Sequence, residues 1–333
     1  MAAPDPRIEP ALLNRGKRVV AADLKHPDDA ARVRDLARGA DVIIEQFRPG
    51  VADRLGIGYD DVRAVNQGVV YCSITGYGQH GPRAGQAGHD LNFLAESGLL
   101  SLVTAPDGTP SMPFTVLADI AGGAYPAVLN ILLALRLREA TGTGERLDIP
   151  MADNLQTLAY RYLAKWEAQA AAGGGTSPAP PAPNGEQLTG GTARYRVYRT
   201  ADDRFVAVGA VEDHFWRRLA KLIGLDETYA DDRSPGNIAE PERVIAATAR
   251  CFARRTAAQW AAVFDGEDVC ATIVATFDQA VRAGTLLADR RHRVVAGGHE
   301  IPALPVPLSA PVRGAGEALS SAPLMDIDET VTW

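Results

Sequence analysis

The chain has 333 residues, which is long enough to bury a sizeable core and favours two domains over one. Hydrophobic residues make up 46% of it and charged residues 23%, a globular balance that excludes a disordered or fibrous chain. The formal net charge of −7 argues against a broad nucleic-acid-binding surface, which needs a basic excess, but allows a local basic cluster around a small anion.

The cysteines and the N-terminal sequence are informative about the compartment in which the protein is expected. The three cysteines, at positions 72, 251 and 270, are odd in number and widely spaced, which favours a reducing compartment and gives no zinc-binding pattern. The first ten residues lack the apolar segment of a signal peptide. The longest apolar run, 127–135, is too short to span a bilayer and is expected to form a buried helix. We therefore expect a cytoplasmic protein without a metal site or a membrane contact.

In the first half of the chain, the hydrophobic pattern alternates between strand and helix. Residues 17–24 and 41–47 are short β-branched runs, and the amphipathic segment 26–40 between them opens with Pro and Asp, as helices do. Residues 68–78 form another apolar strand that ends in glycines, and 118–139 form a long apolar helix. Strands that alternate with helices predict a parallel sheet covered by helices, and so an α/β fold.

The second half of the chain follows a different pattern. A strand and a helix are expected within 147–172, and the Gly- and Pro-rich segment 171–185 reads as an exposed linker. Residues 195–210 predict two antiparallel strands joined by a turn near Asp202 and Asp203, followed by helices to about residue 290. The expected domains are a large α/β domain (1–170), a linker (171–190), a small α+β domain (191–298) and an extended tail that returns to the large domain (299–333).

Three places in the sequence combine acidic or imidazole side chains with element boundaries. His89 and Asp90 open an apolar segment after a glycine-rich stretch, and either residue could simply cap a helix. Asp119 stands at the start of the long apolar helix and is followed by two glycines, so it is either an N-cap or part of a site at a helix N-terminus. Glu212 follows an apolar strand, where it is either a solvated surface group or a functional side chain on a loop.

Basic residues gather around the first two predicted strands. Arg48 lies just past the end of a strand, where ligands bind in open α/β sheets, and a phosphate-bearing ligand would suit it and its basic neighbours. The simpler interpretation is that these residues are ordinary surface charges. The cluster consists of Lys17, Arg18, Lys25, Arg48 and Arg54.

Seven segments, taken in order, carry a resemblance to a known family. They are NRGKRVVAADLK, ADVIIEQFRPGVADRLGIGYDDV, VVYCSITGYGQHGP, AGHDLN, LADIAGG, TGTGERLDIPMAD and VAVGAVEDHF. Together they resemble the family III CoA-transferase and α-methylacyl-CoA racemase (CaiB/BaiF) family over about residues 12 to 290. The resemblance implies a Rossmann-like large domain, an interlocked homodimer and an acyl-CoA thioester as substrate, with no cofactor beyond the coenzyme A of that substrate.

Within this family the AGHDLN segment resembles the racemases, which have a histidine at this point. By that resemblance His89 and Asp119 are the two acid/base groups, and Glu212, from the small domain of a second subunit, orients the histidine. The resemblance also implies that the CoA site is lined by Ala22, Asp23, Leu24, Lys25, Gln46, Phe47, Arg48, Arg54, Gly88, Asp90, Leu91, Asn92 and Phe93. A racemase needs two acid/base groups for a physical reason. Inversion of the carbon next to a thioester requires that one proton is removed and another is added on the opposite face, which two separate groups do best. Backbone N–H groups near Asp119 are candidate donors to the enolate oxygen.

Two alternatives remain open from the sequence. In the family's transferases the counterpart of Asp119 is a nucleophile, so the chain could be a CoA-transferase. From the resemblance we expect that the family's first strand and helix, together with an arginine that contacts CoA, are missing before this sequence. The segment at 189–193 departs from the racemase pattern, and the segments at 268–275 and 325–328 depart from the family pattern. A non-catalytic protein that binds CoA or only dimerises is therefore the third interpretation. The acyl-CoA racemase of lipid metabolism is the favoured one.

Overall fold

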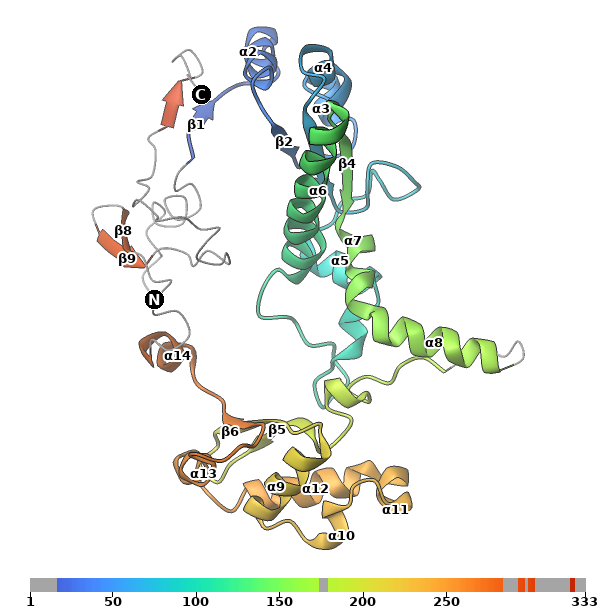
Figure 1. Cartoon of the computed structure of the whole chain (residues 1–333), viewed down its shortest axis with the longest axis vertical. Coiled ribbons are helices and arrows are strands. Elements are labelled where there is room, and N and C mark those ends of the chain that lie inside the picture. The colour runs from blue at the N-terminus through green and yellow to red at the C-terminus, as the bar shows by residue number, and fades with distance from the viewer. Residues whose placement is uncertain (1–16, 174–178, 284–292, 297–298, 303–323, 327–333) are drawn as a thin grey trace. The chain divides into compact units, whose positions relative to one another are not determined.

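The computed structural model describes residues 17–173, 179–283, 293–296, 299–302 and 324–326 (Figure 1). Contacts between residues group the chain into two compact units. Unit 1 consists of Met1–Ser73, Asn130–Leu147 and Thr276–Trp333, and unit 2 of Ile74–Leu129 and Asp148–Ala275.

A sheet in the order β2-β3-β4 (Val42–Glu45, Val70–Thr75 and Arg146–Pro150) contains the predicted parallel strands. Strands β2 and β3 are parallel, with Val42 opposite Val70 and Glu45 opposite Ser73. The β-branched and apolar residues of β3 are almost all buried, which explains why that segment is continuously hydrophobic. The predicted α/β class with a parallel sheet is therefore confirmed.

The strand and helix predicted before this sheet are also present. Helix α2 (Pro27–Ala37) has proline in its first turn together with Asp28 and Asp29, which suit the positive end of a helix dipole. Strand β1 (Val19–Ala21) is shorter than expected and pairs in parallel with β10 (Leu324–Asp326), with Val19 opposite Leu324. The remaining elements of unit 1 are α3 (Val51–Arg54), α4 (Tyr59–Val65), α14 (Phe277–Ala283), β8 (Arg293–Ala296) and β9 (His299–Pro302).

The long apolar helix differs from its prediction in two ways. It begins as a π-helix, η2 (Ala118–Ala124), and only then continues as the α-helix α6 (Tyr125–Thr141). The expectation that it is buried is wrong for the described chain, because its buried residues form a narrow stripe of Ala127, Ile131 and Ala134 while neighbouring apolar side chains are exposed. The exposed ones are Tyr125, Val128, Leu129, Leu132, Leu133 and Leu137. The segment Ala118–Thr141 is the one described helix that is long and apolar enough to cross a membrane by length and composition, criteria that the core helix of a soluble protein also meets.

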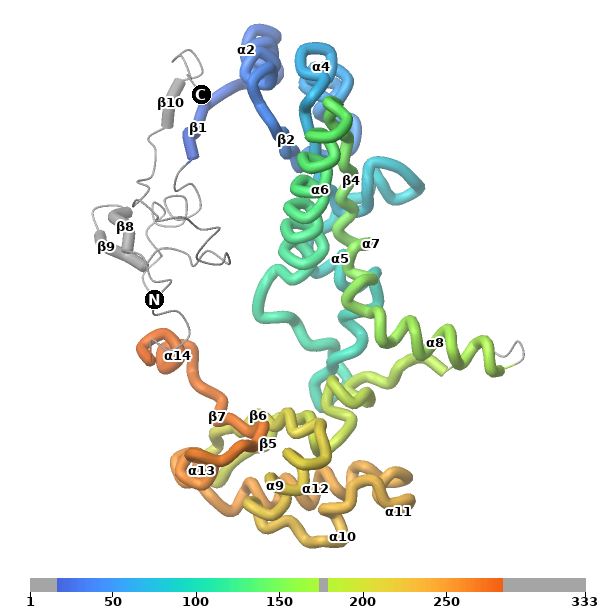
Figure 2. Tube along the Cα trace, viewed as in Figure 1, coloured from blue at the N-terminus to red at the C-terminus, as the bar shows by residue number. Residues whose placement is uncertain are grey.

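Unit 2 contains a small helical core close to the predicted catalytic residues. Tyr77, Phe93, Leu94, Ala118 and Leu155 are buried against one another there. The chain enters this region twice. After β3 it passes through a loop before the next helix, and after β4 it continues directly into a helix (Figure 2). The helices concerned are α5 (Asp90–Glu96), η1 (Leu99–Leu102), α7 (Met151–Asn154), η3 (Leu155–Ala159) and α8 (Tyr160–Ala172).

The hairpin predicted for residues 195–210 is present. Strands β5 (Tyr195–Arg199) and β6 (Phe205–Gly209) are antiparallel, and Asp203 in the turn between them has a left-handed backbone (φ 55°). A third strand, β7 (Ala271–Ile273), pairs with β6 and was not expected. One face of the sheet is buried against α9 (Asp213–Ile223) and α12 (Pro241–Phe252). The other elements here are η4 (Gln187–Thr189), α10 (Glu227–Ala230), α11 (Pro235–Ala239) and α13 (Ala257–Phe264).

Candidate active site

His89 is the N-cap residue of α5 and has an extended backbone. Its N–H donates to Asn92 Oδ1 at 3.0 Å, and its carbonyl accepts the N–H groups of Asn92 and Phe93. The cap is thus made by the backbone of His89, and the imidazole makes no capping bond to the helix. Because the residue is exposed, the imidazole is free to act on a ligand.

The position of His89 is fixed by glycines that pack against an aromatic ring. A Cβ atom at Gly88 would lie 2.7 Å from Cε1 of Phe93, far closer than two carbon atoms tolerate. The Phe93 ring also meets Tyr77 edge-on, with 5.2 Å between ring centroids. Glycine at position 88 therefore allows the loop to pack closely on this ring, with His89 at the start of α5.

Asp119 is the second residue of the π-helix η2. The π-helical bond is explicit, because the N–H of Tyr125 reaches the carbonyl of Ile120 five residues earlier. The helix lies directly against α7: a Cβ at Gly122 would be 2.5 Å from the Met151 carbonyl oxygen, and Asn154 Nδ2 donates to the Gly122 carbonyl at 2.8 Å. Short π-helical segments within helices are frequent at functional sites.

Asp90 connects the two elements. Its Oδ1 accepts the backbone N–H of Asp119 at 2.9 Å, which joins the first turn of α5 to the first turn of η2. Partial burial and the negative charge of Asp90 raise the pKa of Asp119 above the ordinary range, while the nearby His89 opposes this shift. The structure thus brings His89, Asp90 and Asp119 together, and a carboxyl group whose pKa is raised exchanges protons more readily near neutral pH.

The same hydrogen bond changes the expectation for the enolate donors. One of the N–H groups near Asp119, its own, is already bonded to Asp90. Within the part of the chain that the structure describes, the N–H groups of Asp90 and Leu91 have no acceptor, and they lie in the first turn of α5, next to His89.

Glu212 is the N-cap residue of α9 and is exposed. No hydrogen bond or ion pair joins it to His89 among the described residues of one chain. Its carboxylate lies near Cys270, since burial and then the charge of Glu212 are the main causes that raise the pKa of that thiol. Its predicted role, which relies on a second subunit, stays a prediction.

Part of the predicted CoA site forms a cavity of about 440 Å³ in unit 1. Three of the predicted residues, Leu24, Lys25 and Arg54, line it. Arg34, which the sequence analysis missed, adds a third basic side chain, and it also donates to the Gly56 carbonyl at 2.6 Å. Its position one helical turn after the buried Ala30 is the signal that could have found it. Three basic side chains around one hollow suit a phosphate-bearing ligand.

The other predicted CoA residues do not line this cavity. In the loop before α2, Asp23 accepts the Lys25 N–H at 3.0 Å and shapes the turn, with Ala22 beside it. Gln46, Phe47 and Arg48 follow the end of β2, as predicted, and all three are exposed. Asp90 to Phe93 lie on α5: Leu91 and Asn92 are exposed and Phe93 is buried.

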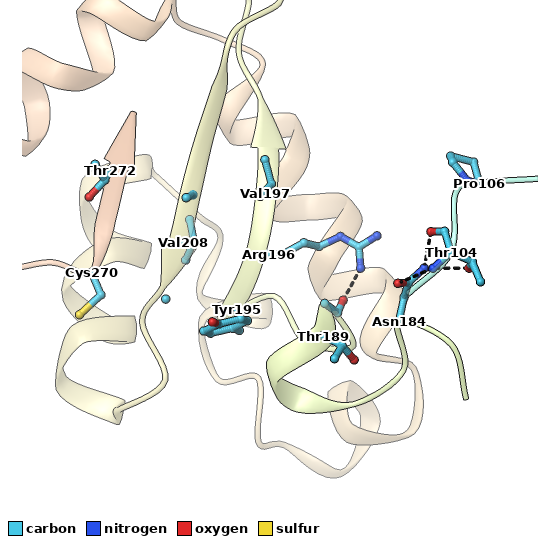
Figure 3. Close-up of a pocket in the computed structure, with 13 residues that line it drawn as sticks. Thr104, Pro106, Asn184, Thr189, Tyr195, Arg196, Val197, Val208, Cys270 and Thr272 are labelled. Atoms are coloured by element: carbon cyan, nitrogen blue, oxygen red, sulfur yellow. Dashed lines mark hydrogen bonds between the residues drawn. The ribbon is translucent and has the colours of Figure 1, made fainter. Parts of the chain in front are cut away.

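An open groove of about 890 Å³ lies over the exposed face of the β5-β6-β7 sheet (Figure 3). Tyr195, Val197 and Thr272 line it from the strands, and Asn184 borders it from a loop that is held to Thr104 by hydrogen bonds. Cys270, the neighbour of Glu212, also lines the groove. The sequence analysis did not anticipate this groove, because β7 was not predicted.

Residues 9–328 match the family model described as CoA-transferase family III. The chain belongs to this family. Alpha-methylacyl-CoA racemase of Homo sapiens is 37% identical over 285 residues, which is 84% of this chain and 70% of the human protein. Acetyl-CoA:oxalate CoA-transferase of Acetobacter aceti is 31% identical over 304 residues, or 90% of this chain and 75% of that protein.

The fold agrees with this assignment. The crystal structure of a CaiB/BaiF family protein from Brucella suis matches with a TM-score of 0.73 and 27% identity, covering 94% of this chain and 80% of that one. The family includes both racemases and CoA-transferases among the relatives of this chain. Membership therefore supports an enzyme of acyl-CoA chemistry and leaves the reaction type to the residues of the site.

Proposed function

We propose that this protein inverts the α-carbon of a 2-methylacyl-CoA thioester through an enolate, using His89 and Asp119 as the two proton carriers. The observation that carries the proposal is the junction of α5 and η2. There an exposed imidazole and a carboxyl group of raised pKa lie near one another, on two elements joined by the Asp90 carboxylate. One group accepts the α-proton, and the other gives a proton to the opposite face.

The enolate formed between these steps carries charge on the former thioester oxygen. The backbone N–H groups of Asp90 and Leu91 support its stabilisation, since they are unbonded among the described residues and adjoin His89. The Glu212 carboxylate, contributed by a second copy in a homodimer, would hold the His89 tautomer. The cavity at Lys25, Arg34 and Arg54 would take a phosphate group of coenzyme A.

The test follows both enantiomers of one chiral 2-methylacyl-CoA separately in deuterated water. The intact protein should invert each enantiomer and incorporate deuterium at the α-carbon. His89→Ala should abolish inversion, with a loss of about 10²–10⁴-fold, yet leave Asp119 able to exchange the α-proton of one enantiomer. Asp119→Ala should leave exchange of the other enantiomer only. Full-rate inversion by His89→Ala would exclude this mechanism.

A transferase is the second candidate, because relatives such as the Acetobacter aceti enzyme are CoA-transferases and Asp119 is exposed. In that reaction the Asp119 carboxylate attacks the thioester carbonyl, the C–S bond breaks, and CoA leaves as the thiolate while an acyl anhydride forms on Asp119. Hydroxylamine would trap this intermediate, and mass spectrometry would find the modified residue. Transfer of CoA from the acyl-CoA to an added carboxylic acid, without uptake of deuterium, would favour this candidate over racemisation.

A further inference from the structure

The turn between β6 and α9 places Glu212 at the N-cap of α9. The short side chains preferred at this position, such as aspartate, accept a hydrogen bond from the first turn of their own helix, and glutamate is not among them. Glu212 has N-cap geometry, with φ −75° and ψ 146°, but its carboxylate makes no such bond. The α9 helix therefore does not fix the orientation of this side chain, and the orientation depends on how firmly the turn itself is held.

A single buried guanidinium holds the turn on both sides of Glu212. Nη1 of Arg194 donates to the Val211 carbonyl at 2.8 Å and to Asp213 Oδ1 at 2.7 Å. Val211 and Asp213 are the two chain neighbours of Glu212. The Arg194 side chain is only 7% exposed, so these bonds are largely shielded from water.

The same guanidinium is anchored from behind. Its Nε and Nη2 donate to the two oxygens of Asp232, at 2.7 and 2.6 Å, in a bidentate pair. Its carbon atom also lies 5.7 Å from the centroid of the buried Trp216 ring on α9. A planar guanidinium engaged on two edges has little rotational freedom, and a lysine cannot reproduce its fork of donors.

We propose that Arg194 is a positioning residue, which fixes the turn at 211–213 so that the Glu212 carboxylate is held in one orientation toward the imidazole it serves. This inference rests on the proposed racemase function and on the role of Glu212 in it. All the bonds that carry it lie within one chain, so it holds whichever subunit supplies the imidazole.

The test compares Arg194→Met with Glu212→Gln in the full-length protein, using the two-enantiomer deuterium assay. If Arg194 acts through Glu212, both variants should slow proton transfer between His89 and the α-carbon. Inversion, and exchange of the enantiomer whose α-proton faces His89, should fall by up to about 100-fold. Exchange of the other enantiomer through Asp119 and the KM should change little. The double variant should be no slower than Glu212→Gln alone.

Arg233→Met is the matched control. Arg233 also contacts Asp213, at 3.0 Å, but it is 62% exposed and does not reach Val211, so its loss removes the same charge and should leave both exchange rates unchanged. If Arg194→Met does not fold, Asp213→Asn loosens the same turn while keeping the bidentate pair with Asp232, and it should give the same one-sided loss.

Two results would overturn the proposal in different ways. An equal loss of exchange for both enantiomers would show that Arg194 acts only through the amount of folded protein. An inversion rate unaffected by Glu212→Gln would show that Glu212 does not orient the imidazole. Arg194 could then not act through Glu212, and the proposal would be wrong.

Discussion

Replacing Gly122 with alanine tests whether the contact between η2 and α7 places Asp119. The new Cβ would lie 2.5 Å from the Met151 carbonyl oxygen, which belongs to backbone and cannot rotate away. Carbon and oxygen atoms settle at about 3.3 Å or more. The two helices must therefore separate by roughly 0.8 Å, taking the start of η2 with them.

Helix propensity and overpacking have opposite effects on the stability of Gly122→Ala, and their sizes predict which effect is larger. Alanine in place of glycine favours a helix by at most about 1 kcal/mol, whereas overpacking of a tight contact costs about 1–3 kcal/mol. Gly122→Ala should thus lower the unfolding temperature, and the shift of Asp119 should slow proton exchange by up to about 100-fold.

Gly123→Ala is the control within the same helix. Its Cβ would meet the Sδ atom of Met151 at 3.1 Å, and this flexible thioether can move aside. Thermal unfolding and deuterium exchange, measured on both variants, should separate them clearly. Equal stability and equal exchange rates would show that the close approach at Gly122 does not position the Asp119 carboxyl group.

Further predictions follow from the contacts of the site and of unit 1. Burial and, after it, the charge of Asp90 raise the pKa of Asp119; Asp90→Asn keeps an oxygen for the Asp119 N–H but removes that charge. Because the anion then forms more easily, the acidic limb of the pH profile for exchange by Asp119 should move to lower pH; a limb that stays in place would contradict this cause. Arg54→Ala should raise the KM for acyl-CoA several-fold, and added salt should reduce the difference; an unchanged KM would remove Arg54 from the CoA site. Asn66→Ala deletes three hydrogen bonds: two from its amide to the carbonyls of Ala37 and Ala40, at 2.9 and 2.8 Å, and one that its oxygen accepts from the Gly68 N–H at 3.1 Å. It should cost about 1–3 kcal/mol of stability in chemical denaturation, and a change under about 0.5 kcal/mol would count against it.

Local patterns were sufficient to predict several elements. The β-branched runs of β2 and β3 predicted strands, and their alternation with helices predicted a parallel sheet. The hairpin of β5 and β6 was predictable from its alternation and from the aspartates in its turn. The acidic and imidazole groups at 89 and 119 stood out because they begin apolar segments.

Features that depend on distant parts of the chain could not be predicted. Pairing of β1 with β10 joins segments from opposite parts of the sequence, and neither carries a signal for the other. The bond from the Asp119 N–H to Asp90 depends on how η2 packs, and no spacing in the sequence encodes that.

The π-helix η2 changes the direction in which the side chains before it point relative to those of α6. A π-helical turn accommodates one residue more than an α-helical turn, and each residue of an α-helix turns the chain by about 100° about its axis. Shortening η2 by one residue, for instance Ala124, would restore regular winding and turn Asp119 by about that angle relative to Ala127. The direction of the Asp119 carboxyl group thus depends on the number of residues in η2.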